Sequence, residues 1–119
     1  CVPPYELTRQ HLVAEYRELP RIFTLAKAAH ARGLDPSTCP QEYRLGPGHV
    51  KFFYPRLAWL RRRFTELYDE MIARGYTPNL PRDIGADTRE LPPEWNHGWR
   101  PTFTALRLNK ARIAERLAA

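Results

Sequence analysis

The sequence predicts an all-α fold, a compact three-helix bundle that forms a single domain over residues 1–119. Three stretches carry apolar residues at helical spacing, and long Pro- and Gly-rich connections separate them. No stretch alternates apolar and polar residues as a half-buried strand does. With 119 residues, 43% of them hydrophobic, the chain is long enough for one hydrophobic core and leaves little room for a second.

The first helix is expected from about Tyr5 to Ala31, with Thr8 as its candidate N-cap. Pro20 lies inside this segment, where a proline bends a helix or occupies the first turn of a new one. A loop over residues 33–40, which holds two prolines and a glycine, then follows. The apolar positions that define the buried face of this helix are Leu12, Tyr16, Leu19 and Phe23.

The second helix is expected to start after Gly48 and to continue to about Arg74, with a kink at Pro55. A Pro-rich connection over residues 76–102 leads to a third helix at about 103–117. The apolar positions of the second helix are Val50, Phe53, Leu57, Leu60, Phe64, Leu67 and Met71. Those of the third helix are Phe103, Leu106, Ile113 and Leu117.

The charge of the chain points to a polyanionic partner, because the formal net charge is +6 and the pI is about 9.7. The 19 basic residues are mostly arginines, whose planar guanidinium suits phosphates, although a GC-rich genome explains the same bias. Residues 43–65 hold six basic residues and no acid, whereas residues 66–95 hold seven acids and three basic residues. Such a sided surface is what a DNA-binding protein needs, and solvated helix faces are the alternative.

No metal site, cofactor or membrane segment is expected. Cys1 and Cys39 form no CxxC pair and show no metal-ligand spacing with the four histidines. A disulfide between the two cysteines stays open, although free thiols are expected in the cytoplasm. No apolar run approaches the roughly 20 residues that span a bilayer. We expect a cytoplasmic monomer, associated with the nucleoid when bound to DNA.

The densest group of polar residues lies in the first predicted helix, between Gln10 and Arg21. Arg17 and Arg21 are four residues apart, and His11 and Glu18 are seven apart, so each pair shares a helix face. Two interpretations are open. In the first, the charged side chains form ordinary ion pairs on the helix surface. In the second, the arginines bind phosphates and the carboxylate faces a cationic transition state.

Two sequence blocks carry a resemblance: residues 11–21, HLVAEYRELPR, and residues 45–54, LGPGHVKFFY. Both blocks, at this separation, resemble the pyrimidine-dimer DNA glycosylase and abasic-site lyase family. Gly33, Arg74-Gly75-Tyr76 and Ala111-Arg112 also fall in register with it, so the likeness covers essentially the whole chain.

The resemblance implies a repair enzyme that acts on cis-syn cyclobutane pyrimidine dimers and abasic sites in double-stranded DNA, without a metal or cofactor. Glu18 matches the family's indispensable glutamate, and the family's nucleophile is the N-terminal α-amine. Such an amine has a pKa of about 7.7–8.0, so a useful fraction is neutral near pH 7. The DNA-contacting or site-organising residues that the resemblance implies are His11, Arg17, Arg21, Arg112 and Arg116.

The two ends of the chain depart from the family pattern. The family's Thr-Arg-(Ile/Val)-Asn start would lie immediately before Cys1, and its aromatic tail would follow Ala119. We expect a shortened chain, disarmed but able to bind DNA. The alternative is that Cys1 supplies the amine, and its thiol then traps an abasic aldehyde as a thiazolidine. An abasic-site lyase without dimer specificity and a non-catalytic DNA-binding remnant are the alternative functions.

Overall fold

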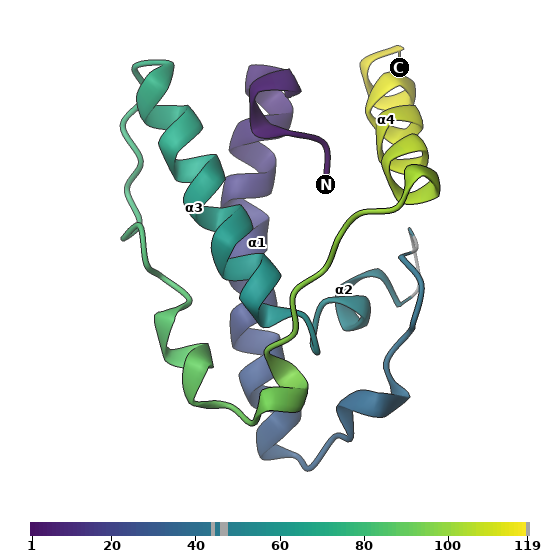
Figure 1. Ribbon diagram of the computed structural model, residues 1–119. Coiled ribbons are helices and arrows are strands. Elements are labelled where there is room, and N and C mark those ends of the chain that lie inside the picture. The colour runs from purple at the N-terminus through teal and green to yellow at the C-terminus, as the bar shows by residue number, and fades with distance from the viewer. Residues whose placement is uncertain (44, 46–47, 119) are drawn as a thin grey trace.

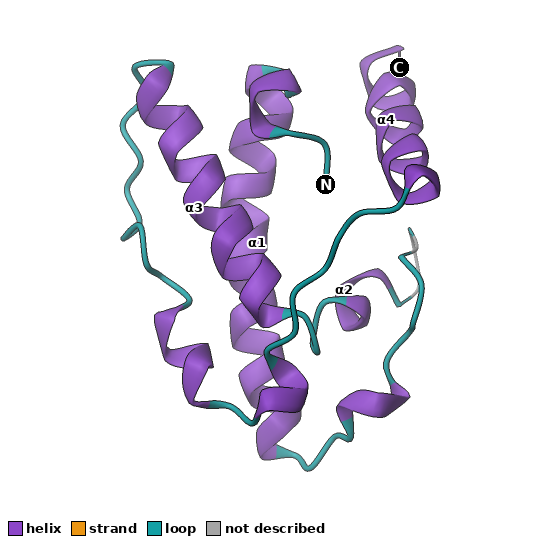
Figure 2. Cartoon of the chain, viewed as in Figure 1, coloured by secondary structure: helices purple, strands orange, loops and turns teal. Residues whose placement is uncertain are grey.

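The computed structural model describes the chain except residues 44, 46–47 and 119, and it describes no side chains at 116–118. Within this described part the chain forms α-helices and short 3₁₀ helices and no strand (Figure 2), which confirms the all-α prediction. The α-helices are α1 (Arg9–Ala31), α2 (His49–Phe52), α3 (Leu57–Ala73) and α4 (Phe103–Ala118). The 3₁₀ helices are η1 (Pro4–Glu6), η2 (Pro36–Thr38), η3 (Ala86–Glu90) and η4 (Pro93–Trp95).

Helix α1 begins at Arg9, four residues after the predicted start. The preceding prolines form the separate turn η1, and the Thr8 side chain accepts the backbone N–H of His11, which confirms Thr8 as the N-cap. Pro20 lies inside α1 and does not open a new helix, since α1 continues to Ala31. Helix α1 therefore presents one continuous face over 23 residues.

The predicted second helix is interrupted, so the expectation of one kinked helix from Gly48 to Arg74 is wrong. A single turn, α2, is followed by non-helical residues 53–56 before α3 begins. Pro55 is the cause, because a proline lacks an N–H and disfavours the helical conformation of the residue before it. The break exposes backbone groups that pair with the Pro-rich connection: the Pro55 carbonyl accepts the His97 N–H, and Arg56 forms an antiparallel bridge with Asn96.

The core lies between α1 and α3, which run side by side in Figure 1. The Tyr16 and Phe64 rings stack at 5.4 Å between their centroids. The Tyr16 hydroxyl donates to the Asn79 side-chain oxygen and accepts the Leu80 N–H, which fixes the start of the connection against α1. The buried side chains of α1 are Leu12, Tyr16, Leu19, Phe23, Ala26 and Ala29, and those of α3 are Leu57, Leu60, Arg63, Phe64, Leu67 and Met71. All four positions predicted for the first helix are buried.

The connection over residues 76–102 packs against the core. Trp95 is only 2% exposed and meets the His30 ring edge-on at 5.5 Å. The Arg61 guanidinium donates to Thr88 Oγ1 and Asn96 Oδ1, both at 2.7 Å, and so ties the connection to α3. Phe52, Phe53 and Tyr54, which precede α3, are buried as well.

Helix α4 stands apart from α1 and α3, and the N-terminus lies between α1 and α4 (Figure 1). Phe103, one of the apolar positions of the third predicted helix, is 75% exposed and lies beneath the Arg107 guanidinium. Ala105 is the buried residue among the described side chains of α4, and Leu106 and Ile113 are half-buried. Leu117 lies outside the described side chains. The apolar stripe of α4 was too short to fix its face from the sequence.

Neither a membrane span nor a disulfide is found in the part of the chain that the structure describes. No helix there has the length and apolar character needed to cross a bilayer. Cys1 and Cys39 are both free, and Cys39 is buried.

Gly85→Ala is expected to lower the free energy of unfolding by about 1–3 kcal/mol, because the added methyl group overpacks the core. A Cβ at Gly85 would lie 2.5–2.7 Å from the ring carbons of Phe23, which is itself buried. The matched control is Gly98→Ala at an exposed position with no atom within 4 Å of the added carbon, where a change within about 0.5 kcal/mol is expected. Urea unfolding of both variants measures the difference, and equal midpoints would contradict the contact.

Candidate active site

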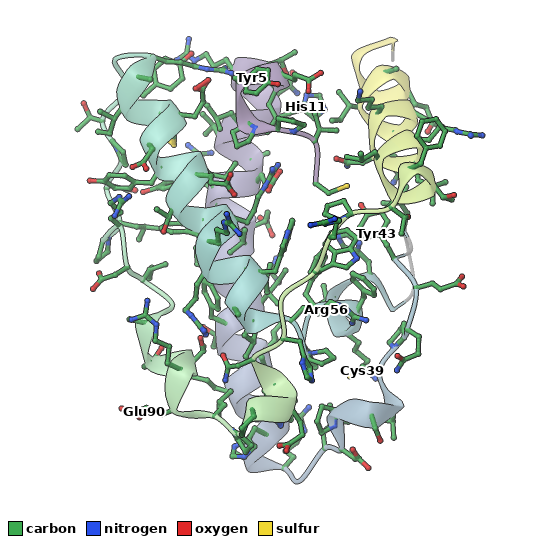
Figure 3. The ribbon with its side chains drawn as sticks, in the orientation of Figure 1. Tyr5, His11, Cys39, Tyr43, Arg56 and Glu90 are labelled. Carbon is green, nitrogen blue, oxygen red and sulfur yellow. The ribbon has the colours of Figure 1, made fainter. Side chains whose placement is uncertain are left out.

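A pocket of about 420 Å³ lies beside the N-terminus, with walls from α1, α2, α3 and α4. It brings together five of the residues selected from the sequence: Cys1, His11, Glu18, Arg21 and Arg112. Figure 3 shows His11 and Tyr43, which also lines the pocket, on the side of the molecule where the N-terminus and α4 lie. The helical spacing of residues 11, 15, 18 and 21 accounts for this shared face.

One of the predicted site residues, Arg17, is not brought into the pocket. Arg17 is exposed and does not line it, because a residue one position before Glu18 points about 100° away around the helix. The side chain of Arg116 lies outside the described residues. Arg112, one helical turn before Arg116, is exposed at the pocket.

Glu18 lies on the open side of the pocket, where its side chain is 66% exposed. Its Oε2 accepts a hydrogen bond from Arg21 Nη1 at 2.7 Å, which is the i,i+3 pair that the sequence spacing predicts. An exposed pair of this kind contributes little to stability. It leaves a solvent-exposed carboxylate at the pocket.

A second carboxylate, Glu15, lines the same pocket and was missed from the sequence. Arg63 of α3 donates to both of its oxygens, Nε to Oε2 at 2.6 Å and Nη2 to Oε1 at 2.9 Å. The Arg63 side chain is 4% exposed, and that of Glu15 is 31% exposed. The signal in the sequence was Arg63 itself, which shares the apolar face of α3 with Leu60 and Leu67 and therefore needs a buried partner.

Arg63 keeps Glu15 ionised. Burial by itself raises the pKa of Glu15, but the hydrogen bonds and the charge of Arg63 outweigh it and hold that pKa below its ordinary value. The Cys1 amine and His49 act in the same direction when they are protonated. Cys1 and His49 line the same pocket as Glu15.

The amino group of Cys1, the first residue of the 119-residue chain, lies at the pocket. It donates to Asn109 Oδ1 at 3.1 Å, and the Val2 N–H donates to the same oxygen at 3.1 Å. Burial, and secondarily the Arg63 charge, lowers the pKa of this amine from its ordinary 8.0 to about 5, while the Glu15 charge opposes the shift. Asn109 is a second residue that the sequence did not single out.

Aromatic rings and two histidines complete the pocket walls. Phe53 stacks on Trp59 at 5.5 Å, and Tyr43 meets the His49 ring edge-on at 5.7 Å. Burial, and then the Glu15 charge, raises the pKa of the Tyr43 phenol. His11 Nδ1 lies 2.8 Å from Thr8 Oγ1, so the N-cap residue also orients this ring. His49 and the aromatic residues thus serve the packing and line the pocket at once.

The arrangement suits covalent chemistry on a carbonyl or on a sugar carbon. An amine with a lowered pKa is a nucleophile at neutral pH, and carboxylates beside it stabilise cationic intermediates. Among the described residues, no group of three or more His, Cys, Asp or Glu side chains could hold a metal ion. The basic side chains at the rim, Arg21 and Arg112, suit a polyanionic substrate.

Comparison with known proteins gives one family match. The family model described as pyrimidine dimer DNA glycosylase matches residues 2–84 of this chain. The matched segment contains the whole of α1, with Glu15 and Glu18, and the whole of α3, with Arg63. It covers more than half of the 119 residues.

Proposed function

Because the chain belongs to the pyrimidine dimer DNA glycosylase family, we propose that it removes the base at cis-syn dimers and cleaves the strand at the abasic site that results. The observation that carries this proposal is the single pocket that gathers an amine, Glu15 and Glu18 beneath basic side chains. The enzyme is proposed to act as a monomer on double-stranded DNA.

The proposed reaction begins when the N-terminal amine attacks C1′ of the deoxyribose as the bond from C1′ to the base breaks. The electron pair of that bond leaves with the base, which takes up a proton. Opening of the C1′–O4′ bond, with a proton transferred to O4′, gives a cationic imine. Glu18 then removes a proton from C2′, and the 3′ phosphate leaves with the electron pair of its bond to C3′. Water hydrolyses the imine and restores the amine.

The arginines are proposed to bind the DNA backbone around this pocket. Arg21 and Arg112 lie at its rim, and Arg17 is exposed on the adjoining face of α1. Phosphate contacts of this kind position a duplex and make binding depend steeply on salt. We assign Arg116 to the same surface from the resemblance, and His11 to the pocket wall, where it meets the sugar or an adjacent phosphate.

Borohydride trapping tests the proposed function. One duplex carries a thymine dimer, a second carries an abasic site, and the adducts are mapped by mass spectrometry. Adducts on the N-terminal residue with both duplexes are the expected result. An adduct with the abasic duplex alone would reduce the protein to an abasic-site lyase or trap. Binding without any adduct would make the 119-residue form a DNA-binding remnant and contradict the proposal.

The pH dependence of imine formation follows from the lowered pKa of the amine. In the 119-residue form, whose first residue is Cys1, the amine is mostly neutral above pH 5, so adduct formation by this form with the abasic duplex is expected to stay level from about pH 6 to 8. Below pH 5 the amine is protonated, and the rate is expected to fall about tenfold for each pH unit. Single-turnover trapping between pH 4 and 9 measures the profile. A rate that still rises through pH 8 would show an amine with the ordinary pKa of a free N-terminus and contradict the burial.

A further inference from the structure

A second pocket, of about 360 Å³, lies between α3 and residues 82–89 of the Pro-rich connection. The connection passes beside α3 on the side away from α4 (Figure 1). Residues 59 and 60 of α3 line the candidate active site, whereas residues 61, 64 and 65 line the second pocket, and none of the described residues lines both. The polar side chains of the second pocket are Arg61, Thr65, Arg82, Asp83 and Arg89.

Arg61 presents a guanidinium in a fixed position at this pocket. Its Nη1 donates to Thr88 Oγ1 and to Asn96 Oδ1, both at 2.7 Å. Thr88 is fully buried, and its hydroxyl donates to the Gly85 carbonyl at 2.6 Å, which holds the acceptor in place. Both acceptors are uncharged, and Arg61 forms no ion pair with any residue that the structure describes. Its positive charge is therefore not neutralised by a carboxylate of the described chain.

Two more arginines bring their guanidinium groups to the same pocket. Arg89 is exposed, and its side chain makes no hydrogen bond or ion pair with the described residues. Arg82 binds Asp69 through Nε and Nη2, each at 3.0 Å, which leaves its Nη1 for another acceptor. Asp83 is the carboxylate among the described lining residues. The three arginines outnumber Asp83 and Asp69 together, so the pocket keeps an excess of positive charge.

The positive charges of Arg61 and Arg89 oppose each other at this pocket. Burial, and secondarily the Arg89 charge, lowers the pKa of the Arg61 guanidinium. Arginines nonetheless stay protonated at neutral pH, so both side chains keep their charge. An anion bound between them removes this repulsion. A planar guanidinium matches the oxygens of a phosphate through two parallel hydrogen bonds, so a phosphate group suits the pocket.

We propose that the second pocket binds a phosphate group between Arg61 and Arg89, with Arg82 Nη1 as a further donor. The volume of the pocket is in the range of small-ligand sites. The phosphate belongs either to a small phosphorylated molecule or to the backbone of DNA, and both present the same oxygens to the arginines. Binding is non-covalent, and it is independent of the proposed reaction because the two pockets are separate. Asp83 is the lining group that opposes the anion.

Titration with inorganic phosphate tests the site without DNA. Backbone amide signals of Thr65, Gly85 and Ala86, which line the pocket, report its occupancy in ¹H–¹⁵N NMR spectra at constant ionic strength. Saturable shifts are expected, and Arg89→Gln is expected to raise the dissociation constant about tenfold because one charged donor is lost. The matched control is Arg62→Gln, which removes the same charge from an exposed position outside the pocket and should leave the constant within about twofold.

Asp83→Asn is expected to change the affinity in the opposite direction. The amide keeps the size of this exposed side chain and removes the negative charge at the pocket, so the dissociation constant for inorganic phosphate is expected to fall at least about threefold. A substitution that only disturbed the connection would weaken binding. A gain in affinity therefore reports the charge at the pocket, and a constant that does not fall overturns the proposal.

Duplex binding at several salt concentrations, measured by fluorescence anisotropy, identifies the source of the phosphate. If the DNA backbone occupies the pocket, the slope of log Kd against log salt concentration becomes smaller by about one in Arg89→Gln and stays in Arg62→Gln. An unchanged slope, with weakened binding of inorganic phosphate, assigns the pocket to a small phosphorylated molecule.

Two outcomes of the phosphate titration overturn the site. In the first, inorganic phosphate leaves the three amide signals unmoved. In the second, wild type, Arg89→Gln and Arg62→Gln bind it equally, or the two variants lose affinity equally. Neither the titration nor the anisotropy needs strand cleavage, so a failure of the proposed repair reaction leaves both measurements valid.

Discussion

Glu18→Gln is expected to lower strand cleavage of dimer-containing and abasic duplexes by at least about 100-fold while DNA binding stays within about threefold. The amide keeps the size of the side chain and an oxygen that can accept from Arg21, so the exposed pair on α1 survives in neutral form. What is lost is the base that takes the C2′ proton. Single-turnover cleavage on denaturing gels gives the rate, and fluorescence anisotropy at fixed salt gives the binding.

The control for this substitution is Asp69→Asn, which neutralises another exposed carboxylate that pairs with an arginine, here Arg82. Asp69 does not line the pocket, so cleavage is expected to stay at the wild-type rate. Cleavage by Glu18→Gln at the wild-type rate would remove Glu18 from the reaction. It would also contradict the residue assignment that the family resemblance implies.

Arg63→Met is expected to lower the free energy of unfolding by about 3 kcal/mol, the largest effect on stability among these predictions. The substitution leaves Glu15 in its half-buried position without the guanidinium that binds both oxygens. The neighbouring Arg62→Met is the control, because Arg62 is exposed and a change within about 0.5 kcal/mol is expected there. Urea unfolding at pH 7 measures both variants, and equal stabilities would contradict the pairing.

The difference in free energy of unfolding between wild type and Arg63→Met is expected to depend on pH. The pKa of Glu15 is lowered in the folded protein, so the pair contributes its full stabilisation above the unfolded pKa of about 4.5. That contribution is lost as the pH falls through the folded pKa, because the carboxylate is then protonated in both states. The difference in free energy of unfolding between wild type and Arg63→Met is therefore expected to be largest above about pH 5 and to decrease below about pH 4.

Local patterns predicted most of α1 and the core. The apolar spacing of residues 12, 16, 19 and 23 found the buried face, and the short polar side chain of Thr8 found the start of the helix, because both signals act within a few residues. The break between α2 and α3 was not predictable in the same way. Pro55 is compatible with a kink or with a break, and the pairing of its carbonyl with His97, 42 positions along the chain, is a long-range contact.

The candidate site was predictable where its residues lie together in one segment of the sequence. Glu18 and Arg21 lie in a dense block of polar residues, and the family resemblance supplied their roles. Glu15 lies in the same block, but its importance depends on Arg63, which is 48 residues away on another helix. Asn109 carries no signal in sequence at all, because an asparagine on the face of an amphipathic helix is ordinary until its partners are known.

The Asn109 side-chain oxygen accepts two N–H groups and so links the position of α4 to the hydrogen bonding of the first two residues. One oxygen on α4 receives the N–H groups of the first two residues, while few side chains of α4 are buried elsewhere. A duplex that displaced α4 through Arg112 would change the hydrogen bonding of the amine, and a change at the amine would alter the seating of α4. Thermodynamic linkage makes such coupling reciprocal between the two equilibria, so the position of α4 and the hydrogen bonding of the first residue shift together. The helix that carries Arg112 and the residue at the pocket are linked in this way through one side-chain oxygen.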